Sequence, residues 1–257
     1  MQSTRERLRA HRRKKRLRLL RLFLYLAAIA GVMIGSWRYV HQPGFAFGSV
    51  TINGSSLITA DDVVRMAGGD PPCNLFNMSI SRLKEALKSD IRFKDAQVSY
   101  RFPATLNVVV QEREPAVYVA NSYRSYLKLD YSGVVMSVTT GIPDAKAPVI
   151  AGLKCGNVYL GDTVANEGVL RILGFLQHIN GEARDRIAEI CVDNNNGVLL
   201  RMRSSFPIVL GKLEGVEKKA AIFNTVFNEI KDKNIKAEYI DLTFAKPYIK
   251  LLPGEKK

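Results

Sequence analysis

Side chains that could perform metal or nucleophilic chemistry are few and widely separated in this chain of 257 residues. The histidines are His11, His41 and His178, and the cysteines are Cys73, Cys155 and Cys191. No two cysteines have the Cys-x-x-Cys spacing that zinc sites and thioredoxin-like motifs share. We therefore expect neither a metal site nor a dithiol site, and no cofactor.

The sequence motifs of common catalytic centres are also missing. Gly-x-Ser-x-Gly, the Walker A phosphate loop and His-Glu-x-x-His do not occur in the sequence. Gly211-Lys212 resembles the end of a phosphate loop, but the upstream glycine is missing, so we interpret it as a strand-to-helix turn. The acidic pairs have structural explanations, because Asp61 and Asp62 suit a helix N-terminus and Glu112 and Glu114 a strand end. These patterns predict a protein that is not an enzyme.

Positive charge is concentrated at the N-terminus. The chain has 38 basic and 24 acidic side chains, a formal net charge of +14. Residues 1–21 hold ten Arg or Lys and one acid, so the rest carries 38 − 10 = 28 basic and 24 − 1 = 23 acidic side chains, a net charge of +5. An uncharged apolar run, 22–37, follows the basic segment directly. Three explanations compete: a nucleic-acid-binding arm, a cleaved export signal and a membrane anchor.

The anchor explains this pattern best. A bilayer core needs about 20 apolar residues, and the stretch 17–40 is long enough because its flanking arginines can reach the headgroups. The sequence Ala28-Ile29-Ala30 resembles a signal-peptide cleavage site, but the apolar run continues beyond it. Trp37 and Tyr39 would lie at the membrane interface.

The same charges predict the orientation of the chain in the membrane. Cationic segments stay on the cytoplasmic side, so residues after Val40 should lie outside. The Arg/Lys tail should bind anionic membrane lipids, and because the rest of the chain is only mildly basic, we expect no nucleic-acid partner. In an exported protein, three cysteines allow at most one bridge. We expect small buried thiols rather than a disulfide framework.

The first segment after the span predicts a small sheet with two helices on one face. Thr59 and Asp62 fit a capping box at the start of the first helix, and Ile80, Leu83 and Leu87 lie on one face of the second. The predicted order is strand 50–52, helix 61–66, helix 79–88, strand 96–102 and strand 106–110.

The second half predicts a mixed α+β domain on a largely antiparallel sheet. Gly133 would supply the positive φ of a hairpin turn, and Asn194-Asn-Asn-Gly197 is a strong hairpin signal. The predicted elements are strands 126–129 and 134–136, a loop 142–148, a helix over 165–180, strands 187–192, 198–202 and 208–210, a helix 216–230, and strands 237–244 and 248–252.

Several motifs, in their order behind a basic tail and one span, resemble the FtsQ/DivIB family of bacterial cell division proteins. The matching pieces are Phe47–Gly54, Asn74–Phe76, Val98–Ala116 and Pro148–Gly152. The resemblance covers nearly the whole chain. It implies a basic cytoplasmic tail 1–21, a transmembrane helix 22–40, a POTRA domain 45–115, an FtsQ/DivIB-like β domain 116–252 and a polar tail 253–257.

The resemblance also implies protein partners. Members of the family act as division scaffolds that recruit or regulate septal peptidoglycan synthesis. Their C-terminal strands receive FtsB/DivIC-type proteins, which pair with FtsL-type proteins. Carried over to this sequence, the partner-binding residues are Phe244, Tyr248, Ile249 and Lys250. Phe244 and Tyr248 would be aromatic anchors, with packing of the sheet as the alternative. Lys250 is also explained as an edge charge that discourages unwanted pairing.

Two other functions fit the same layout. A POTRA-containing assembly receptor would be marked by tandem POTRA repeats or many barrel strands, and the sequence has neither. A membrane-anchored cell-wall hydrolase would be favoured if residues 44–257 released soluble fragments from peptidoglycan.

Overall fold

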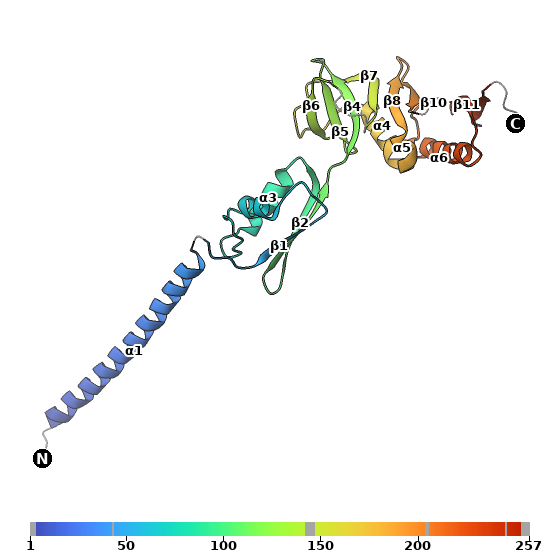
Figure 1. Cartoon of the computed structure of the whole chain (residues 1–257). Coiled ribbons are helices and arrows are strands. Elements are labelled where there is room, and N and C mark those ends of the chain that lie inside the picture. The colour runs from blue at the N-terminus through green and yellow to red at the C-terminus, as the bar shows by residue number, and fades with distance from the viewer. Residues whose placement is uncertain (1–3, 43, 142–146, 204–205, 245, 253–257) are drawn as a thin grey trace. The chain divides into compact units, whose positions relative to one another are not determined.

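The computed structural model of the chain describes residues 4–42, 44–141, 147–203, 206–244 and 246–252, and its side chains from residue 17 onward. The predicted polar tail 253–257, most of the predicted loop 142–148 and the basic side chains before residue 17 lie outside the described residues. The chain divides into two compact units, Met1–Glu112 and Arg113–Lys257 (Figure 1).

The first unit begins with one continuous helix, α1, over Thr4–Val40. Its part Leu17–Val40 has 24 residues, and the most apolar stretch of 18 residues within it has a mean hydropathy of 2.0 and no buried residue. At 1.5 Å per residue this part is about 36 Å long, enough to cross a hydrocarbon core of about 30 Å. The structure therefore has an N-terminal apolar helix of the length and composition of a membrane span.

The remainder of the first unit has the predicted strand-helix-helix-strand-strand order. Its sheet has the strand order β1-β3-β2, in which β1 and β3 are parallel and β2 and β3 antiparallel. The elements are β1 Ser49–Asn53, α2 Ala60–Met66, α3 Ile80–Ser89, β2 Phe93–Arg101 and β3 Thr105–Glu112.

Local signals position the two helices of this unit. The predicted capping box is present: the Thr59 hydroxyl accepts from the amide of Asp62 at 3.3 Å, and the Asp62 carboxylate accepts from the amide of Thr59 at 2.9 Å. Ser79 caps α3 by accepting from the amide of Arg82 at 3.3 Å. These caps satisfy amides that a helix start would otherwise leave unpaired.

Alternating apolar residues of the strands form the core beneath the helices. Leu106, Val108 and Val110 of β3 are buried, and Leu83 and Leu87 of α3 pack in the same cluster. The residues between them on β3 are half-buried or exposed. The unit is therefore a sheet covered on one face, as the sequence predicts.

The second unit is built on a nine-stranded sheet with the order β12-β11-β10-β9-β8-β7-β4-β5-β6. Five of its eight strand pairs are antiparallel and three are parallel, which confirms a mixed α+β domain on a largely antiparallel sheet. Its strands are β4 Pro115–Asn121, β5 Tyr126–Asp130, β6 Val135–Thr139, β7 Val149–Cys155, β8 Ile187–Val192, β9 Gly197–Met202, β10 Pro207–Lys212, β11 Ala237–Asp241 and β12 Tyr248–Leu251.

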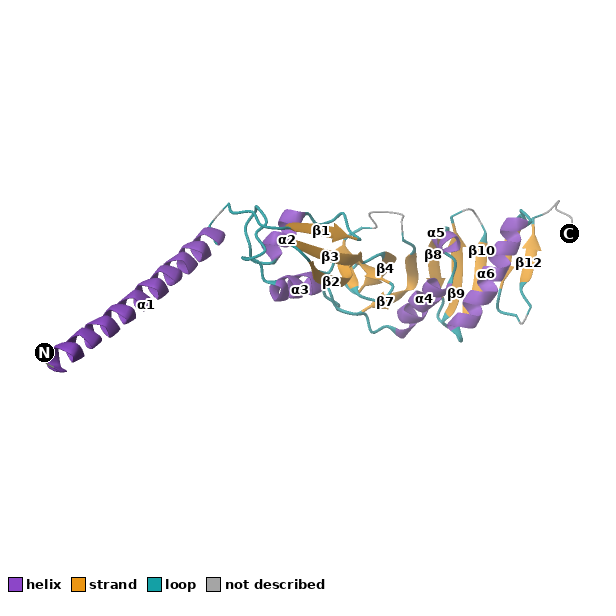
Figure 2. Ribbon diagram, turned by 90° about the horizontal axis from the view of Figure 1, so that it is seen from below, coloured by secondary structure: helices purple, strands orange, loops and turns teal. Residues whose placement is uncertain are grey.

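Helices cover one face of this sheet (Figure 2). They are α4 Glu167–His178, α5 Gly181–Asp185 and α6 Val216–Asp232. Phe175 of α4 packs edge-on against Phe223 of α6, with ring centroids 5.5 Å apart, and Phe223 stacks on Phe227 at 6.0 Å. The apolar side of α6 faces the core, because Phe223 and Phe227 both belong to its cluster.

The sequence patterns missed three elements of this unit and misplaced the end of a fourth. The strands β4 and β7 and the short helix α5 were not predicted. The predicted strand 237–244 was wrong at its C-terminal end, because β11 stops at Asp241. There the Asp241 carboxylate accepts from the amide of Thr243 at 2.8 Å and from its hydroxyl at 2.6 Å. This Asx-type turn takes the chain out of the strand conformation.

Candidate protein-binding edge

The strand β12 is the last strand of the nine-stranded sheet. It pairs antiparallel with β11, with Ile249 opposite Ile240 and Lys250 opposite Tyr239. Among the described residues no strand pairs with its other side. Such an edge presents unpaired backbone groups that can bind an extended segment of another chain.

Two backbone bonds show which groups of β12 face the open side. The amide of Leu252 donates to the carbonyl of Lys236 at 3.0 Å, on the β11 side. The amide of Leu242 donates to Val209 of β10 at 2.8 Å, on the other side of β11. Successive residues of a strand point their backbone groups to opposite edges. Since Leu252 bonds toward β11, Lys250 also faces β11, and the N–H and C=O groups of Ile249 and Leu251 point to the open side. The bond of Leu242 toward β10 gives the same alternation when it is followed through β11.

The side chains of β12 divide between the two faces of the sheet. Ile249 is half-buried and packs against the core. Tyr248 lies on the opposite face, is 52% exposed, and has its ring centroid 6.0 Å from that of Tyr239. Lys250 lies 5.6 Å from the centroid of the same Tyr239 ring. These rings and the lysine form an exposed surface beside the open edge, which we call the Tyr239–Tyr248 face.

An ion pair holds Lys250 on this face. Its ammonium donates to the Glu238 carboxylate at 3.0 Å, and this hydrogen bond raises the pKa of Lys250. Both side chains are exposed, so the pair contributes little stability. Its effect is to fix the position of a positive charge next to the edge.

Phe244 lies in the connection between β11 and β12 and is 64% exposed. The sequence patterns placed it within a strand, and the structure places it after the Asx-type turn of Asp241 and Thr243. Neither Phe244 nor Tyr248 is buried in the core. Tyr248 still packs with its ring against Tyr239 on the sheet, so packing of the sheet stays an alternative for it, and the binding role of both residues stays a prediction.

Lys219 and Gly211 support this connection, a role that the sequence patterns did not predict for either residue. The ammonium of Lys219 on α6 donates to the carbonyls of Leu210 and Leu242, at 2.8 and 2.7 Å. Gly211 has a φ of +66°, and an added Cβ would lie 2.7 Å from the methyl group of Thr243. A side chain at Gly211 would therefore meet both strain and a clash. The interpretation of Gly211-Lys212 as a strand-to-helix turn is wrong, because both residues lie within β10. The partner of Gly211, 32 positions later, was not visible in the sequence.

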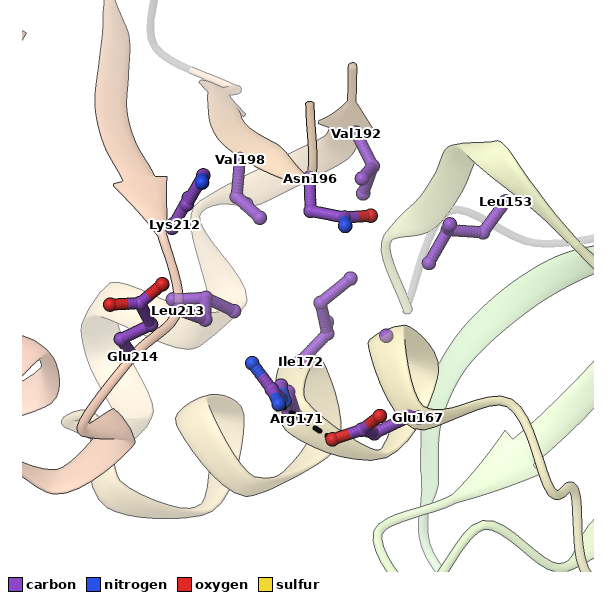
Figure 3. A pocket seen from close by; sticks show the side chains of 11 residues that line it. Leu153, Glu167, Arg171, Ile172, Val192, Asn196, Val198, Lys212, Leu213 and Glu214 are labelled. Carbon is purple, nitrogen blue, oxygen red and sulfur yellow. Dashed lines mark hydrogen bonds and ion pairs between the residues drawn. The ribbon is translucent and has the colours of Figure 1, made fainter. Parts of the chain in front are cut away.

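A pocket of about 190 Å³ lies between α4 and the ends of neighbouring strands (Figure 3). Glu167 and Arg171 line it and form an ion pair with each other at 2.6 Å. The other lining residues are Leu153, Gly168, Ile172, Val192, Asn196, Val198, Lys212, Leu213 and Glu214. This pocket is smaller than typical ligand sites, and the side chains lining it offer no histidine, cysteine or serine.

Among the residues whose side chains are described, histidines and cysteines form no metal-binding cluster. No group of three or more His, Cys, Asp or Glu side chains capable of holding a metal occurs in the described part of the chain. Cys73, Cys155 and Cys191 are free, and burial raises the pKa of each thiol. His178 is exposed on α4, with its Nδ1 2.7 Å from the Gly174 carbonyl oxygen.

Comparison with known families covers both units. The model described as "POTRA domain, FtsQ-type" matches residues 45–113, and the one described as "Cell division protein FtsQ/DivIB, C-terminal" matches residues 117–243. The fold therefore defines a protein with an N-terminal apolar helix, a POTRA domain and a second α+β domain that ends on an open strand. The chain belongs to the FtsQ/DivIB family of cell division proteins.

Two relatives of similar sequence carry the names of this family. Cell division protein DivIB of Clostridium tetani is 21% identical over 209 residues, covering 79% of this chain and 78% of the relative. Cell division protein FtsQ of Syntrophotalea carbinolica is 23% identical over 235 residues, covering 90% and 80%. The solved extracytoplasmic domain of DivIB from Geobacillus stearothermophilus is 16% identical, with a TM-score of 0.33, covering 49% of this chain and 99% of that one.

Proposed function

We propose that this chain is a non-enzymatic scaffold of the bacterial division septum, anchored once in the cytoplasmic membrane. Its open β12 edge binds an FtsB/DivIC-type protein, and through it an FtsL-type protein, outside the membrane. This binding recruits or regulates septal peptidoglycan synthesis. The observation that carries the proposal is a free strand edge beside exposed aromatic side chains, in a chain of the FtsQ/DivIB family.

The topology of the proposal follows from charge and hydropathy. The basic tail 1–21 lies in the cytoplasm and binds anionic lipids, and residues 22–40 cross the membrane. The POTRA domain 45–115 and the β domain 116–252 lie outside, followed by the polar tail 253–257. The exposed apolar surface of Leu17–Val40 supports this assignment, since an unburied helix with an 18-residue stretch of mean hydropathy 2.0 needs a nonpolar environment.

The binding mode follows from the geometry of β12. A partner strand would bond to the outward backbone groups of Ile249 and Leu251, and main-chain bonds of this kind supply affinity for any extended segment. Specificity would come from the Tyr239–Tyr248 face and from Phe244, because exposed aromatic side chains that become buried dominate the energy of interfaces. Lys250 would favour an acidic residue on the partner strand.

Binding of the purified full chain to the extracytoplasmic part of its FtsB/DivIC-type partner tests the proposed site. The double variant Phe244→Ala/Tyr248→Glu should weaken binding by about 30-fold or more, since two interface anchors are lost and a carboxylate is introduced. Full retention of the partner by this variant would refute the docking site.

A matched control uses exposed aromatic side chains of the same unit away from β12. Tyr123 and Tyr159 are 70% and 76% exposed. The variant Tyr123→Ala/Tyr159→Glu likewise removes one exposed aromatic ring and replaces a tyrosine with glutamate, and it should bind as the unchanged chain does. Depletion of the protein in its own bacterium tests the division role separately: filaments without septa are expected, and normal septa would contradict the proposal.

A further inference from the structure

One end of the POTRA-type sheet gathers exposed aromatic side chains. β1 and β3 start at this end and β2 finishes there, because Ser49 pairs with Thr105 and Thr105 with Arg101. We call it the proximal end. Phe102, in the turn between β2 and β3, is 88% exposed, and Phe76 is 55% exposed. Phe76 stacks on the ring of Phe47 with centroids 4.8 Å apart.

Close backbone contacts hold these aromatic segments together. Phe47 donates its amide to Cys73 at 2.9 Å and accepts from the amide of Leu75 at 3.0 Å. The amide of Ser49 donates to Ala104 in the β2–β3 turn at 2.9 Å. A Cβ on Gly48 would lie 2.7 Å from the Ala104 carbonyl oxygen and would clash with Leu75. The aromatic residues therefore lie on a fixed part of the fold and share one end of the domain.

The end of α1 is bonded to the same place. Asn74 is buried, its side-chain amide donates to the carbonyl of Val40 at 2.8 Å, and its side-chain oxygen accepts from the amide of Phe76 at 3.1 Å. Val40 is the last residue of α1. One asparagine thus connects the C-terminus of the candidate membrane span to the segment that carries Phe76.

If Leu17–Val40 crosses the bilayer, the short lengths of chain involved place the proximal end near the membrane surface. Two residues of chain span about 7 Å at most, so the Cα of Phe76 lies within about 7 Å of the Cα of Asn74. A headgroup layer is about 5–7 Å thick on each side of the hydrocarbon core. The aromatic belt begins on α1 itself, where Tyr39 packs edge-on against Phe45 with centroids 5.4 Å apart.

We propose that the proximal end rests on the outer leaflet of the phospholipid bilayer, with Phe47, Phe76 and Phe102 as its lipid-contacting side chains. The inference rests on the membrane-spanning part of the proposed function. Aromatic rings are favoured at the boundary between lipid and water, and the exposed Arg101 beside Phe102 suits lipid phosphates. This contact would fix the height and tilt of the POTRA domain above the membrane.

Fluorescence of a single tryptophan tests this contact. Trp37 is the one tryptophan of the sequence, so Trp37→Phe gives a tryptophan-free chain. Into this background we would introduce Phe76→Trp or Phe102→Trp, reconstitute the full chain in phosphatidylcholine/phosphatidylglycerol vesicles, and add lipid with a spin label on its headgroup. Both tryptophans should lose fluorescence as the labelled fraction rises.

Leu57 supplies the matched control at the other end of the same sheet. It is 50% exposed, and its neighbour Ser56 donates its amide to Glu112, the last residue of β3, at 3.2 Å. The length of β3 places this end about 24 Å from the proximal end. Leu57→Trp should therefore retain its fluorescence in the same vesicles.

The outcomes separate this inference from the span on which it rests. If Trp37 of the unchanged chain is not quenched by the labelled lipid, the membrane span itself is wrong. If Trp37 is quenched but the tryptophans at 76 and 102 are not, the span holds and the lipid contact is refuted. Equal quenching at 57, 76 and 102 would also overturn the proposal, because the proximal end would then have no special role.

Discussion

Replacing Ile249 with proline tests whether a partner binds by strand addition or through side-chain contacts alone. The amide of Ile249 points to the open side of β12, so proline there removes a donor that a partner strand would use and leaves the bonds between β11 and β12 intact. The restriction that proline places on the preceding residue favours extended backbone, which Tyr248 already has as part of the strand.

The size of the effect follows from one lost hydrogen bond. Removing the donor leaves a carbonyl of the partner unpaired at the interface, which costs about 1–3 kcal/mol, or about 5- to 150-fold in dissociation constant. Isothermal titration of the full chain with the extracytoplasmic part of its FtsB/DivIC-type partner measures this change.

Two further variants are controls, one for the lost side-chain packing and one for an amide on the other edge of the strand. Ile249→Val keeps the amide and loses one methyl group from the half-buried side chain, so its binding should be close to that of the unchanged chain. Lys250→Pro removes an amide that faces β11 and should destabilise the sheet. If Ile249→Pro binds within about twofold of Ile249→Val, no backbone bond forms at this position and the strand-addition reasoning is refuted.

Other predictions concern stability. Asp130→Ala should destabilise the second unit by about 3–5 kcal/mol in urea unfolding, because it removes the buried carboxylate from its ion pair with Arg113, whose side chain is 14% exposed. Phe223→Ala should cost about 3–5 kcal/mol in the same assay, against about 0.5 kcal/mol or less for the surface change Ile222→Ala. Hydrogen bonds from Arg92 lower the pKa of Asp90 below its ordinary 3.8, so their stabilisation is complete above pH 3.8 and is lost as the pH falls through the lowered pKa. In the variant Asp90→Asn this loss of stability at acid pH should be smaller, as measured by amide exchange of the POTRA domain.

The first unit was predictable because its signals are local. The capping box at Thr59, the amphipathic spacing of α3 and the alternation along β3 each act within a few residues, and each is present in the structure. The apolar part of α1 was likewise visible as a run without charge. Predictions from such patterns need no knowledge of distant contacts.

The second unit was harder because two of its central strands do not alternate. β4 is buried at four consecutive positions, Ala116–Val119, and lies between β5 and β7 in the sheet. A short continuous apolar run of this kind has no period of two to reveal a strand. β7 pairs in parallel with both β4 and β8, so its neighbours depend on connections that are long in sequence.

The position of Phe244 depends on contacts that no local pattern contains. Read as a continuation of β11, it would alternate into or out of the sheet with its neighbours. Instead Asp241 turns the chain, Lys219 holds the carbonyl of Leu242 from 23 positions away, and Gly211 makes room for Thr243. Because these contacts hold the connection in place, Phe244 stays out of the core and is 64% exposed. A partner would therefore meet the aromatic ring already displayed, and would have less conformational entropy to lose on binding.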